Sequence, residues 1–375
     1  MSGRGDVRDV AGADRAEPVL PRARDDLASI SSYRTQQSLA EVRLQANEWA
    51  EPNPASHYVS AEELDAVLLN RYPTAAADLR GALAQRWGVE ADQIILCNGS
   101  NEVLLNTFLV FGGHGRTTLL FQPTYSMHAR LATIAGGSVA DEQVGPPYAL
   151  DAARTVAVVE RTRPDVVVFC TPNNPTGGLV PDDAILAAAE RAPQALVLVD
   201  EAYAEFSGTT ILPALADHPN IVVSKTFSKA RAAAGLRLGV LIADARLAER
   251  YRAVQLPYNV GVLTQLVALH IAQDDDGVER RVASLRAERE RVYRALQGTP
   301  AVEAFPSEAN FVLFRVRDGD GAAAHARLLA EGVLVRDISA WPGCERCLRV
   351  TIGTPQENDR FIAALAAAFP RKAPE

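Results

Sequence analysis

Two lysines stand out because the rest of the chain almost avoids this residue. Of 38 basic residues only three are lysine, and two of them, Lys225 and Lys229, follow the apolar run 221–223. Arginine does not replace lysine where an amine must lose its proton and attack a carbonyl carbon. Their retention in an arginine-rich chain therefore indicates Schiff-base chemistry, although a solvated surface lysine is the ordinary alternative.

Two polar turns supply groups that can hold an anion and fix an amide. The turn 98–102 follows the apolar run 94–97 and begins a predicted helix. Free N–H groups at a helix start can bind a phosphate, while a plain helix cap is the alternative. After the run 166–170, the proline-containing turn 171–177 forms a rigid loop that could fix one amide side chain.

Two further apolar runs end in an acid and in hydroxyl groups. Asp200 comes directly after the run 196–199, and Tyr203 follows one turn later. A carboxylate in that place should be largely buried and should need a cationic partner, unless it only caps a helix. Thr226 and Ser228 lie beside the two lysines.

Together these turns offer a phosphate cradle, an amide, an acid with a phenol, and an amine with hydroxyls and an arginine. Ligands of open α/β sheets collect beyond the carboxyl ends of the strands, so we expect the four groups to meet in one site. They match what is needed to hold pyridoxal phosphate, a phosphorylated aldehyde with a basic ring nitrogen. The lysine would form the Schiff base, and the acid would keep the ring nitrogen protonated.

Apolar runs alternate with helical stretches in the first two thirds of the chain. This pattern predicts an α/β fold with a large domain, whose mostly parallel sheet is covered by helices on both faces. The last third, with two long helices, three strands and a final helix, is typical of a smaller α+β domain. The predicted strands are 94–97, 118–121, 166–170, 196–199, 221–223, 239–242, 309–315, 332–336 and 348–352, and the predicted helices are 60–69, 75–87, 260–272, 278–296 and 355–369.

The expected domain organisation has three parts. Residues 1–35 form a mobile N-terminal tail and arm, which lacks the apolar core of a signal peptide. Residues 73–255 form the large cofactor-binding domain. Residues 36–72 and 256–375 together form the small domain.

Composition argues against several classes of function. The formal net charge of −8 speaks against nucleic-acid binding, and no apolar run is long enough to span a membrane. Four cysteines suit a reducing cytoplasm better than a disulfide scaffold. The CxxC at 344–347 lacks the second cysteine pair or paired histidines of a metal site. We therefore expect a cytoplasmic protein without a metal.

In their order along the chain, the polar motifs match a known family. From about residue 44 to 369 the chain resembles fold-type I pyridoxal-phosphate-dependent aminotransferases, and in particular bacterial histidinol-phosphate aminotransferases. Each motif alone is weak, whereas the whole series is specific. The motifs are Asn-Glu at 47–48, Asn-Arg-Tyr-Pro at 70–73, Asn-Gly-Ser-Asn-Glu at 98–102, Pro-Thr-Tyr at 123–125, Asn-Asn-Pro-Thr-Gly at 173–177, Asp-Glu-Ala-Tyr at 200–203, Thr-Phe-Ser-Lys at 226–229, Gly-Leu-Arg at 235–237 and Cys-Leu-Arg-Val-Thr-Ile-Gly-Thr at 347–354.

The resemblance implies roles for individual residues around the cofactor. Lys229 would be the Schiff-base lysine, and Tyr125 would stack on the cofactor ring. Asn174, Asp200 and Tyr203 would contact that ring. Because one tyrosine of the family comes from a neighbouring subunit, the protein would be a homodimer with composite active sites. The cofactor phosphate would be bound by Ser100, Asn101, Thr226, Ser228 and Arg237, and by Tyr72 of the partner subunit.

The resemblance also implies the substrates. Histidinol phosphate has no carboxylate, so the family binds its phosphate with arginines that also take a carboxylate of the second substrate. Arg336 and Arg349 fit those places, and Tyr33, Tyr258 and Asn310 are further candidate pocket residues. The implied reaction converts L-histidinol phosphate and 2-oxoglutarate to imidazole acetol phosphate and L-glutamate.

One departure from the family leaves the amino donor open. After Asn-Glu at 47–48 the family usually continues Asn-Pro, whereas this chain has Trp-Ala-Glu-Pro at 49–52. That segment approaches the substrate side chain, so an aromatic-amino-acid (phenylalanine) aminotransferase of the same fold is the alternative. A phospho-amino-acid decarboxylase and a non-catalytic binding module are remoter. A nicotinamide dehydrogenase is weaker still, because no G-x-G-x-x-G follows a predicted strand.

Overall fold

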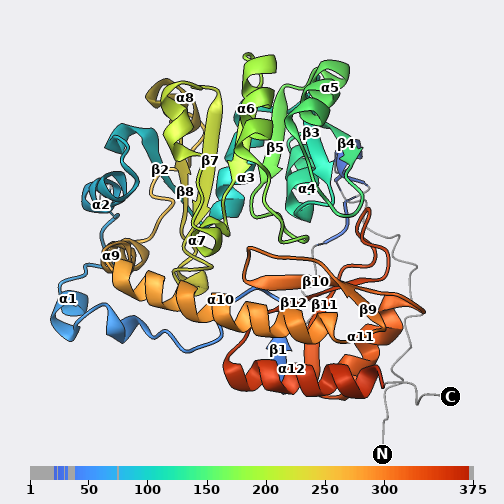
Figure 1. The fold of residues 1–375 in the computed structure, drawn as a ribbon. Coiled ribbons are helices and arrows are strands. Elements are labelled where there is room, and N and C mark those ends of the chain that lie inside the picture. Colours follow the sequence, from blue (N-terminus) through green and yellow to red (C-terminus); the bar gives the residue numbers. More distant parts are fainter. Residues whose placement is uncertain (1–20, 23, 29, 33–38, 74–75, 371–375) are drawn as a thin grey trace, which may run out of the picture.

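The computed structural model describes residues 21–22, 24–28, 30–32, 39–73 and 76–370. Two sheets, each packed against helices, form the upper and lower halves of the molecule in Figure 1. The expected tail and arm at 1–35 falls mostly outside the described residues, as does Tyr33. No helix in the described ranges is both long and apolar enough to cross a lipid bilayer.

The larger sheet has seven strands, most of them parallel. Only β8 is antiparallel to its neighbours, β2 and β7, among the pairs that the structure describes. The central strands are fully buried because both faces are covered, which explains their continuous Val, Ile and Leu runs. In sheet order the strands are β2 (Ile94–Cys97), β8 (Gly239–Ile242), β7 (Ile221–Thr226), β6 (Leu196–Asp200), β5 (Val166–Cys170), β3 (Thr117–Gln122) and β4 (Ser138–Gln143).

Alternate side chains of these strands enter two separate cores. In β5, Val167 and Phe169 face the core beneath α2, α5, α6 and α9, whereas Val166 and Val168 face the core beneath α3, α4 and α8. The expected α/β architecture, with helices on both faces of a mostly parallel sheet, is therefore confirmed (Figure 1). These helices are α2 (Ala77–Trp87), α3 (Ser100–Phe111), α4 (Ser126–Ile134), α5 (Ala152–Thr162), α6 (Asp182–Arg191), α8 (Ala245–Arg252) and α9 (Val262–Ala272).

The smaller sheet has five strands and packs against three helices. Its first strand, β1, comes from the N-terminal part of the chain and pairs in parallel with β11, whereas the other pairs are antiparallel. Apolar side chains of all three helices share one core with the sheet. The strands are, in sheet order, β1 (Val42–Leu44), β11 (Val333–Asp337), β12 (Cys347–Thr351), β10 (Phe311–Val316) and β9 (Val302–Ala304), and the helices are α10 (Asp275–Gln297), α11 (Gly321–Ala330) and α12 (Pro355–Ala368).

The remaining elements are short. The capping box predicted at Ser60 is present, because the Ser60 hydroxyl accepts the Glu63 N–H and the Glu63 carboxylate accepts the Ser60 N–H. The helix that it opens, α1 (Ala61–Asp65), nevertheless ends before the predicted residue 69. The other short elements are α7 (Ala204–Ser207), η1 (Asp25–Leu27), η2 (Ala55–His57), η3 (Ala91–Gln93), η4 (Leu212–Ala216) and η5 (Ala234–Leu236).

The division into domains stays a prediction, and its second boundary needs a change. The expected boundary at residue 255 places α9 in the small domain, yet Val267, Ala268 and Ile271 lie in the same core as the seven-stranded sheet. α9 also packs against α2. We therefore propose that the large domain continues through α9 instead of ending at residue 255.

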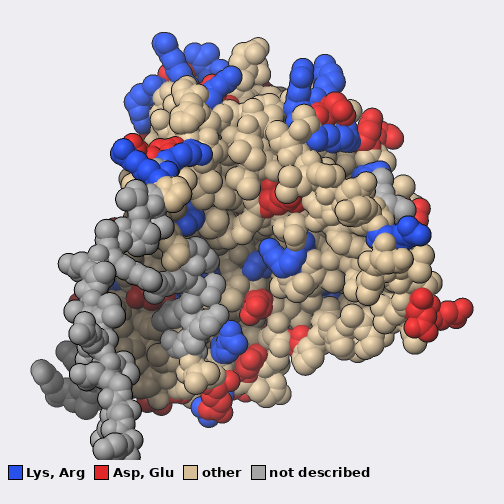
Figure 2. Space-filling model, turned by 180° about the vertical axis from the view of Figure 1, so that it is seen from behind, with Lys and Arg blue, Asp and Glu red and all other residues tan. Residues whose placement is uncertain are grey.

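Charged side chains of both signs are interspersed on the surface seen from behind. Figure 2 shows charged side chains at the rim of this face and a smaller group of both signs near its middle, with uncharged surface between them. Among the described residues drawn there, no extended patch of a single sign covers the middle of the face.

Candidate active site

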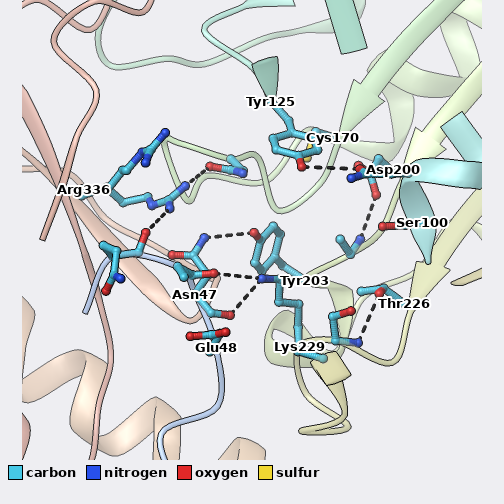
Figure 3. A pocket seen from close by; sticks show the side chains of 18 of the residues that line it. Asn47, Glu48, Ser100, Tyr125, Cys170, Asp200, Tyr203, Thr226, Lys229 and Arg336 are labelled. Carbon is cyan, nitrogen blue, oxygen red and sulfur yellow. Dashed lines mark hydrogen bonds between the residues drawn. The ribbon is translucent and has the colours of Figure 1, made fainter. Parts of the chain in front are cut away.

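A cavity of about 510 Å³ lies where the two sheets meet. It opens at the carboxyl ends of β5, β6 and β7 and at the start of α3, where an α/β sheet offers a binding site. The structure brings twelve of the residues predicted from the sequence together in its wall. They are Ser100, Asn101, Tyr125, Asn174, Asp200, Tyr203, Thr226, Ser228, Lys229, Arg237, Arg336 and Arg349. Figure 3 labels seven of them: Ser100, Tyr125, Asp200, Tyr203, Thr226, Lys229 and Arg336.

Three other predicted residues lie elsewhere in the described chain. Tyr72 and Tyr258 are exposed and stack on each other, with 4.3 Å between ring centroids, away from this cavity. Asn310 is buried behind the wall, where its amide donates to the carbonyl oxygen of Asn47 at 3.0 Å. Within one chain, Tyr258 and Asn310 are therefore not pocket residues, and Asn310 instead supports the backbone of the wall.

Lys229 follows β7 and directs its amine into the cavity. Nζ donates to the carbonyl oxygens of Ala46 at 3.3 Å and Asn47 at 3.0 Å, which fixes its position. Burial lowers the pKa of the Lys229 amine to about 7, and the positive charge of Arg349 adds to this effect. Near neutral pH a large fraction of the amine is therefore unprotonated and able to attack a carbonyl carbon.

Lys225, the second lysine of the motif, points away from this cavity. Its ammonium forms a buried ion pair with Glu201, with 2.7 Å between Nζ and Oε2, and lies 5.9 Å from the ring centroid of Trp87. The two lysines of the motif therefore have different surroundings. Lys229 faces a polar cavity, and Lys225 is held in the protein interior by an acid.

Asp200 ends β6 and is almost completely buried. Its Oδ2 lies 3.2 Å from Nε2 of His128, and its Oδ1 accepts the N–H of Ala202 at 3.2 Å. His128 is itself buried in α4, with Nδ1 3.3 Å from the hydroxyl of Thr124. His128 has no metal-ligand spacing that would distinguish it in the sequence, and the one signal beside it is Thr124, four residues earlier.

We expect His128 to position Asp200, so its replacement should weaken cofactor binding more than it weakens folding. His128→Phe removes one partner of a buried carboxylate, and the apparent affinity for pyridoxal phosphate should fall about tenfold. Titration of the apoprotein, followed by absorbance, measures this affinity. His128→Gln retains an N–H donor and should recover part of the loss. Equal losses in the two variants would contradict a positioning role.

An anion cradle forms where the start of α3 meets Arg237. Gly99 precedes α3 with φ of +82°, and a Cβ there would collide with the Arg237 guanidinium. A Cβ at Gly239 would collide with the Gly99–Ser100 peptide. Arg237 donates to the Ser228 hydroxyl at 3.4 Å. The two glycines thus allow a cation, hydroxyls and helix N–H groups to converge closely, which suits the phosphate of the expected cofactor.

Two arginines face the cavity from the small sheet. Arg336 of β11 and Arg349 of β12 are opposite each other in the strand register, so their side chains share one face. Arg349 donates to Oδ1 of Asn174 at 2.5 Å and to the Gln45 carbonyl oxygen at 3.0 Å. The cavity wall also contains several residues that the sequence analysis did not assign to it, among them Arg43, Gln45, Asn47, Glu48 and Trp341.

The four cysteines are free and buried. Among the described residues, no group of three or more His, Cys, Asp or Glu side chains is placed to hold a metal ion.

Comparison with known proteins agrees with this geometry. The family described as aminotransferase class I and II matches residues 31–365, so the chain belongs to it and is a pyridoxal-phosphate-dependent transaminase. The chain is 41% identical to histidinol-phosphate aminotransferase of Thermobifida fusca, covering 93% of this chain and 95% of that one. It is 40% identical to histidinol-phosphate aminotransferase of Streptomyces avermitilis, covering 91% of this chain and 95% of that one.

A solved structure shows the same fold. Histidinol-phosphate aminotransferase from Sinorhizobium meliloti in complex with pyridoxal-5'-phosphate superposes with a TM-score of 0.82. The alignment covers 94% of this chain and 99% of that chain, at 22% sequence identity. At this identity the likeness establishes the fold alone.

The pKa of Lys229 predicts how cofactor capture depends on pH. Only the neutral amine attacks the aldehyde, so the capture rate of the apoprotein should be half-maximal near pH 7. Below that pH the rate should fall about tenfold per unit, and above about pH 8 it should level off. Stopped-flow absorbance of apoprotein mixed with pyridoxal phosphate measures this. A rate still rising steeply between pH 9 and 10, at the ordinary pKa of about 10.4, would contradict the lowered value.

Proposed function

We propose that the protein transfers the amino group of L-histidinol phosphate to 2-oxoglutarate, as a step of histidine biosynthesis. The products are imidazole acetol phosphate and L-glutamate. The observation that carries the proposal is the pair Arg336 and Arg349, which face the same cavity as the Lys229 amine. Arginine forks bind phosphate and carboxylate alike, so one site can take the donor phosphate and then the acceptor carboxylate. The names of the relatives at 40–41% identity support the same substrates.

The proposed roles of the cavity residues follow from their chemistry. When bound, pyridoxal phosphate supplies a carbonyl for the amine and an electron sink for the bond broken at the donor Cα. Lys229 holds the cofactor covalently and, once released, moves the Cα proton as a general base. Asp200 keeps the ring nitrogen protonated. Ring contacts come from Tyr125, Asn174 and Tyr203, and phosphate contacts come from Ser100, Asn101, Thr226, Ser228 and Arg237.

The proposed assembly is a homodimer in which Tyr72 of the partner subunit completes each site. Tyr72 lies outside the cavity of its own chain, where it is exposed and stacks on the exposed Tyr258. Large exposed apolar side chains of this kind favour association with another protein surface. The large apolar side chains exposed in the segments 64–72 and 256–263 are Leu64, Leu68, Leu69, Tyr72, Leu256, Tyr258 and Leu263. Light scattering that gives a monomer mass at micromolar concentration would contradict the dimer.

The proposed location is the cytoplasm. Free buried cysteines, including the neighbouring Cys344 and Cys347, suit a compartment that keeps thiols reduced. Free 2-oxoglutarate and L-glutamate belong to the same setting under the proposed function.

The absorption spectrum of the cofactor-loaded protein tests the reaction. Adding L-histidinol phosphate without a keto acid should convert the spectrum to that of the amine form of the cofactor, and 2-oxoglutarate should reverse the change. A spectrum that responds to phenylalanine and not to histidinol phosphate would identify an aromatic-amino-acid aminotransferase. Release of carbon dioxide from a phospho-amino acid would identify a decarboxylase.

A further inference from the structure

A short segment after β1 forms one wall of the cavity and ends in Glu48. Asn47 anchors this segment, because its N–H donates to the Thr351 hydroxyl at 2.9 Å and its amide donates to the Tyr203 hydroxyl at 3.0 Å. The Asn47 carbonyl oxygen accepts the amide of Asn310. The backbone that presents Glu48 is therefore held by Tyr203, which follows β6, by Thr351 of β12 and by Asn310, which precedes β10.

Among the described residues, two carboxylates line the cavity, Glu48 and Asp200, and the two have different surroundings. Asp200 is buried and contacts His128 and the N–H of Ala202. Glu48 is exposed to the cavity and makes no hydrogen bond or ion pair within the part of the chain that the structure describes. Figure 3 shows Glu48 beside Lys229 and Asn47. A carboxylate that accepts no hydrogen bond from the described residues therefore lies close to the reacting amine.

The other charged groups that the described residues place on the substrate side are cations. Arg43, Arg336 and Arg349 line the cavity from three neighbouring strands of the small sheet. Arg43 is paired with Leu334, two residues before Arg336, so the three arginines share one face. This face suits the phosphate of the donor. A carboxylate cannot bind that phosphate, so Glu48 must have a different function.

Resting on the proposed function, we propose that Glu48 selects the amino donor by accepting a hydrogen bond from the ring N–H of its imidazole. Once the phosphate is bound by arginines and the amine lies at Lys229, the ring N–H is the remaining polar donor of L-histidinol phosphate. Neutral imidazole offers one N–H and imidazolium offers two, whereas a phenyl ring offers none. Glu48 therefore favours an imidazole ring over a phenyl ring of similar size.

The residues that depart from the family pattern, 49–52, come directly after Glu48. The unusual sequence begins at Trp49, directly after Glu48, and Trp49 packs against the core of the small sheet. Trp49 is not among the residues that line the cavity. Selectivity carried by Glu48 is therefore compatible with the altered residues that follow it.

The test compares two donors that differ only in the ring. The cofactor-loaded wild type, Glu48→Gln and Glu48→Leu are assayed with L-histidinol phosphate and with L-phenylalaninol phosphate, using 2-oxoglutarate as acceptor. Both variants should lose about 10- to 100-fold in kcat/KM for the imidazole donor, with the larger loss for leucine. The phenyl donor should change less than about threefold, because it has no N–H to lose.

A matched variant and a binding measurement separate the possible outcomes. Glu51→Gln changes another exposed carboxylate three residues later, outside the cavity wall, and should leave both donors unaffected. The affinity for imidazole acetol phosphate, measured by absorbance titration, should fall in the Glu48 variants in parallel with kcat/KM. An equal loss for both donors would show that Glu48 acts on Lys229 and would overturn the proposal. A wild type that does not use L-histidinol phosphate would overturn the proposed function itself.

Discussion

Replacing Lys229 with alanine should abolish transamination. The variant loses both the amine that holds the cofactor and the base that moves the Cα proton, so kcat should fall by about 10⁴-fold or more. Cofactor should still bind through the anion cradle at Gly99 and Arg237, although more weakly. Steady-state assays and a pyridoxal phosphate titration measure the two effects separately.

A second variant at the same position separates the positive charge of Lys229 from the ability of its amine to lose a proton and react. Lys229→Arg retains a cation, but its guanidinium does not lose a proton at physiological pH. It should therefore be as inactive as the alanine variant. Near-normal turnover in either variant would rule out Lys229 as the covalent and basic group.

Replacing Lys225 with methionine should strongly destabilise the protein. Lys225 takes no part in the reaction itself, so the effect should be on folding and not on the catalytic steps. Lys225 and Glu201 are both buried, and Glu201 also accepts hydrogen bonds from the Thr210 hydroxyl and the Ile211 N–H. Removing the lysine leaves a buried carboxylate without its cation, which should lower the free energy of unfolding by about 3–5 kcal/mol. Urea unfolding of the cofactor-loaded protein measures the change.

Two comparisons show whether the buried pair is the cause. The double variant Lys225→Met with Glu201→Gln should be less destabilised than the sum of the two single variants, because no unpaired charge remains. Arg294→Met breaks an exposed ion pair with Glu290 and should cost less than about 1 kcal/mol. A similar small cost for Lys225→Met would show that the Lys225–Glu201 pair contributes little.

The central part of the fold could be predicted from the sequence because its strands are buried on both faces. β5, β6 and β7 contain continuous apolar runs that need no knowledge of tertiary structure. β4 was missed because it lies at the sheet edge, is partly exposed and contains mainly small and polar residues. β1 and β9 are three residues long, which is too short for an alternating pattern to be recognised.

The residues of the candidate site could be predicted where a reactive side chain stands at the end of a strand or shortly after it in the sequence. Asp200 and Lys229 are of this kind, since each stands directly after a buried run or within a few residues of it. His128, Glu48 and Arg43 reach the site only through contacts between distant segments. Their importance depends on which strands are neighbours, and the sequence alone does not specify that order.

The anchoring of Asn47 has a consequence for slow motions of the molecule. This residue bonds to Tyr203 on the side of the large sheet and to Thr351 and Asn310 on the side of the small sheet. The backbone N–H of Asn47 can exchange its hydrogen with solvent only when its hydrogen bond to the Thr351 hydroxyl opens. Deuterium uptake at the Asn47 N–H should therefore report how often the segment after β1 detaches from β12, which removes one wall of the cavity.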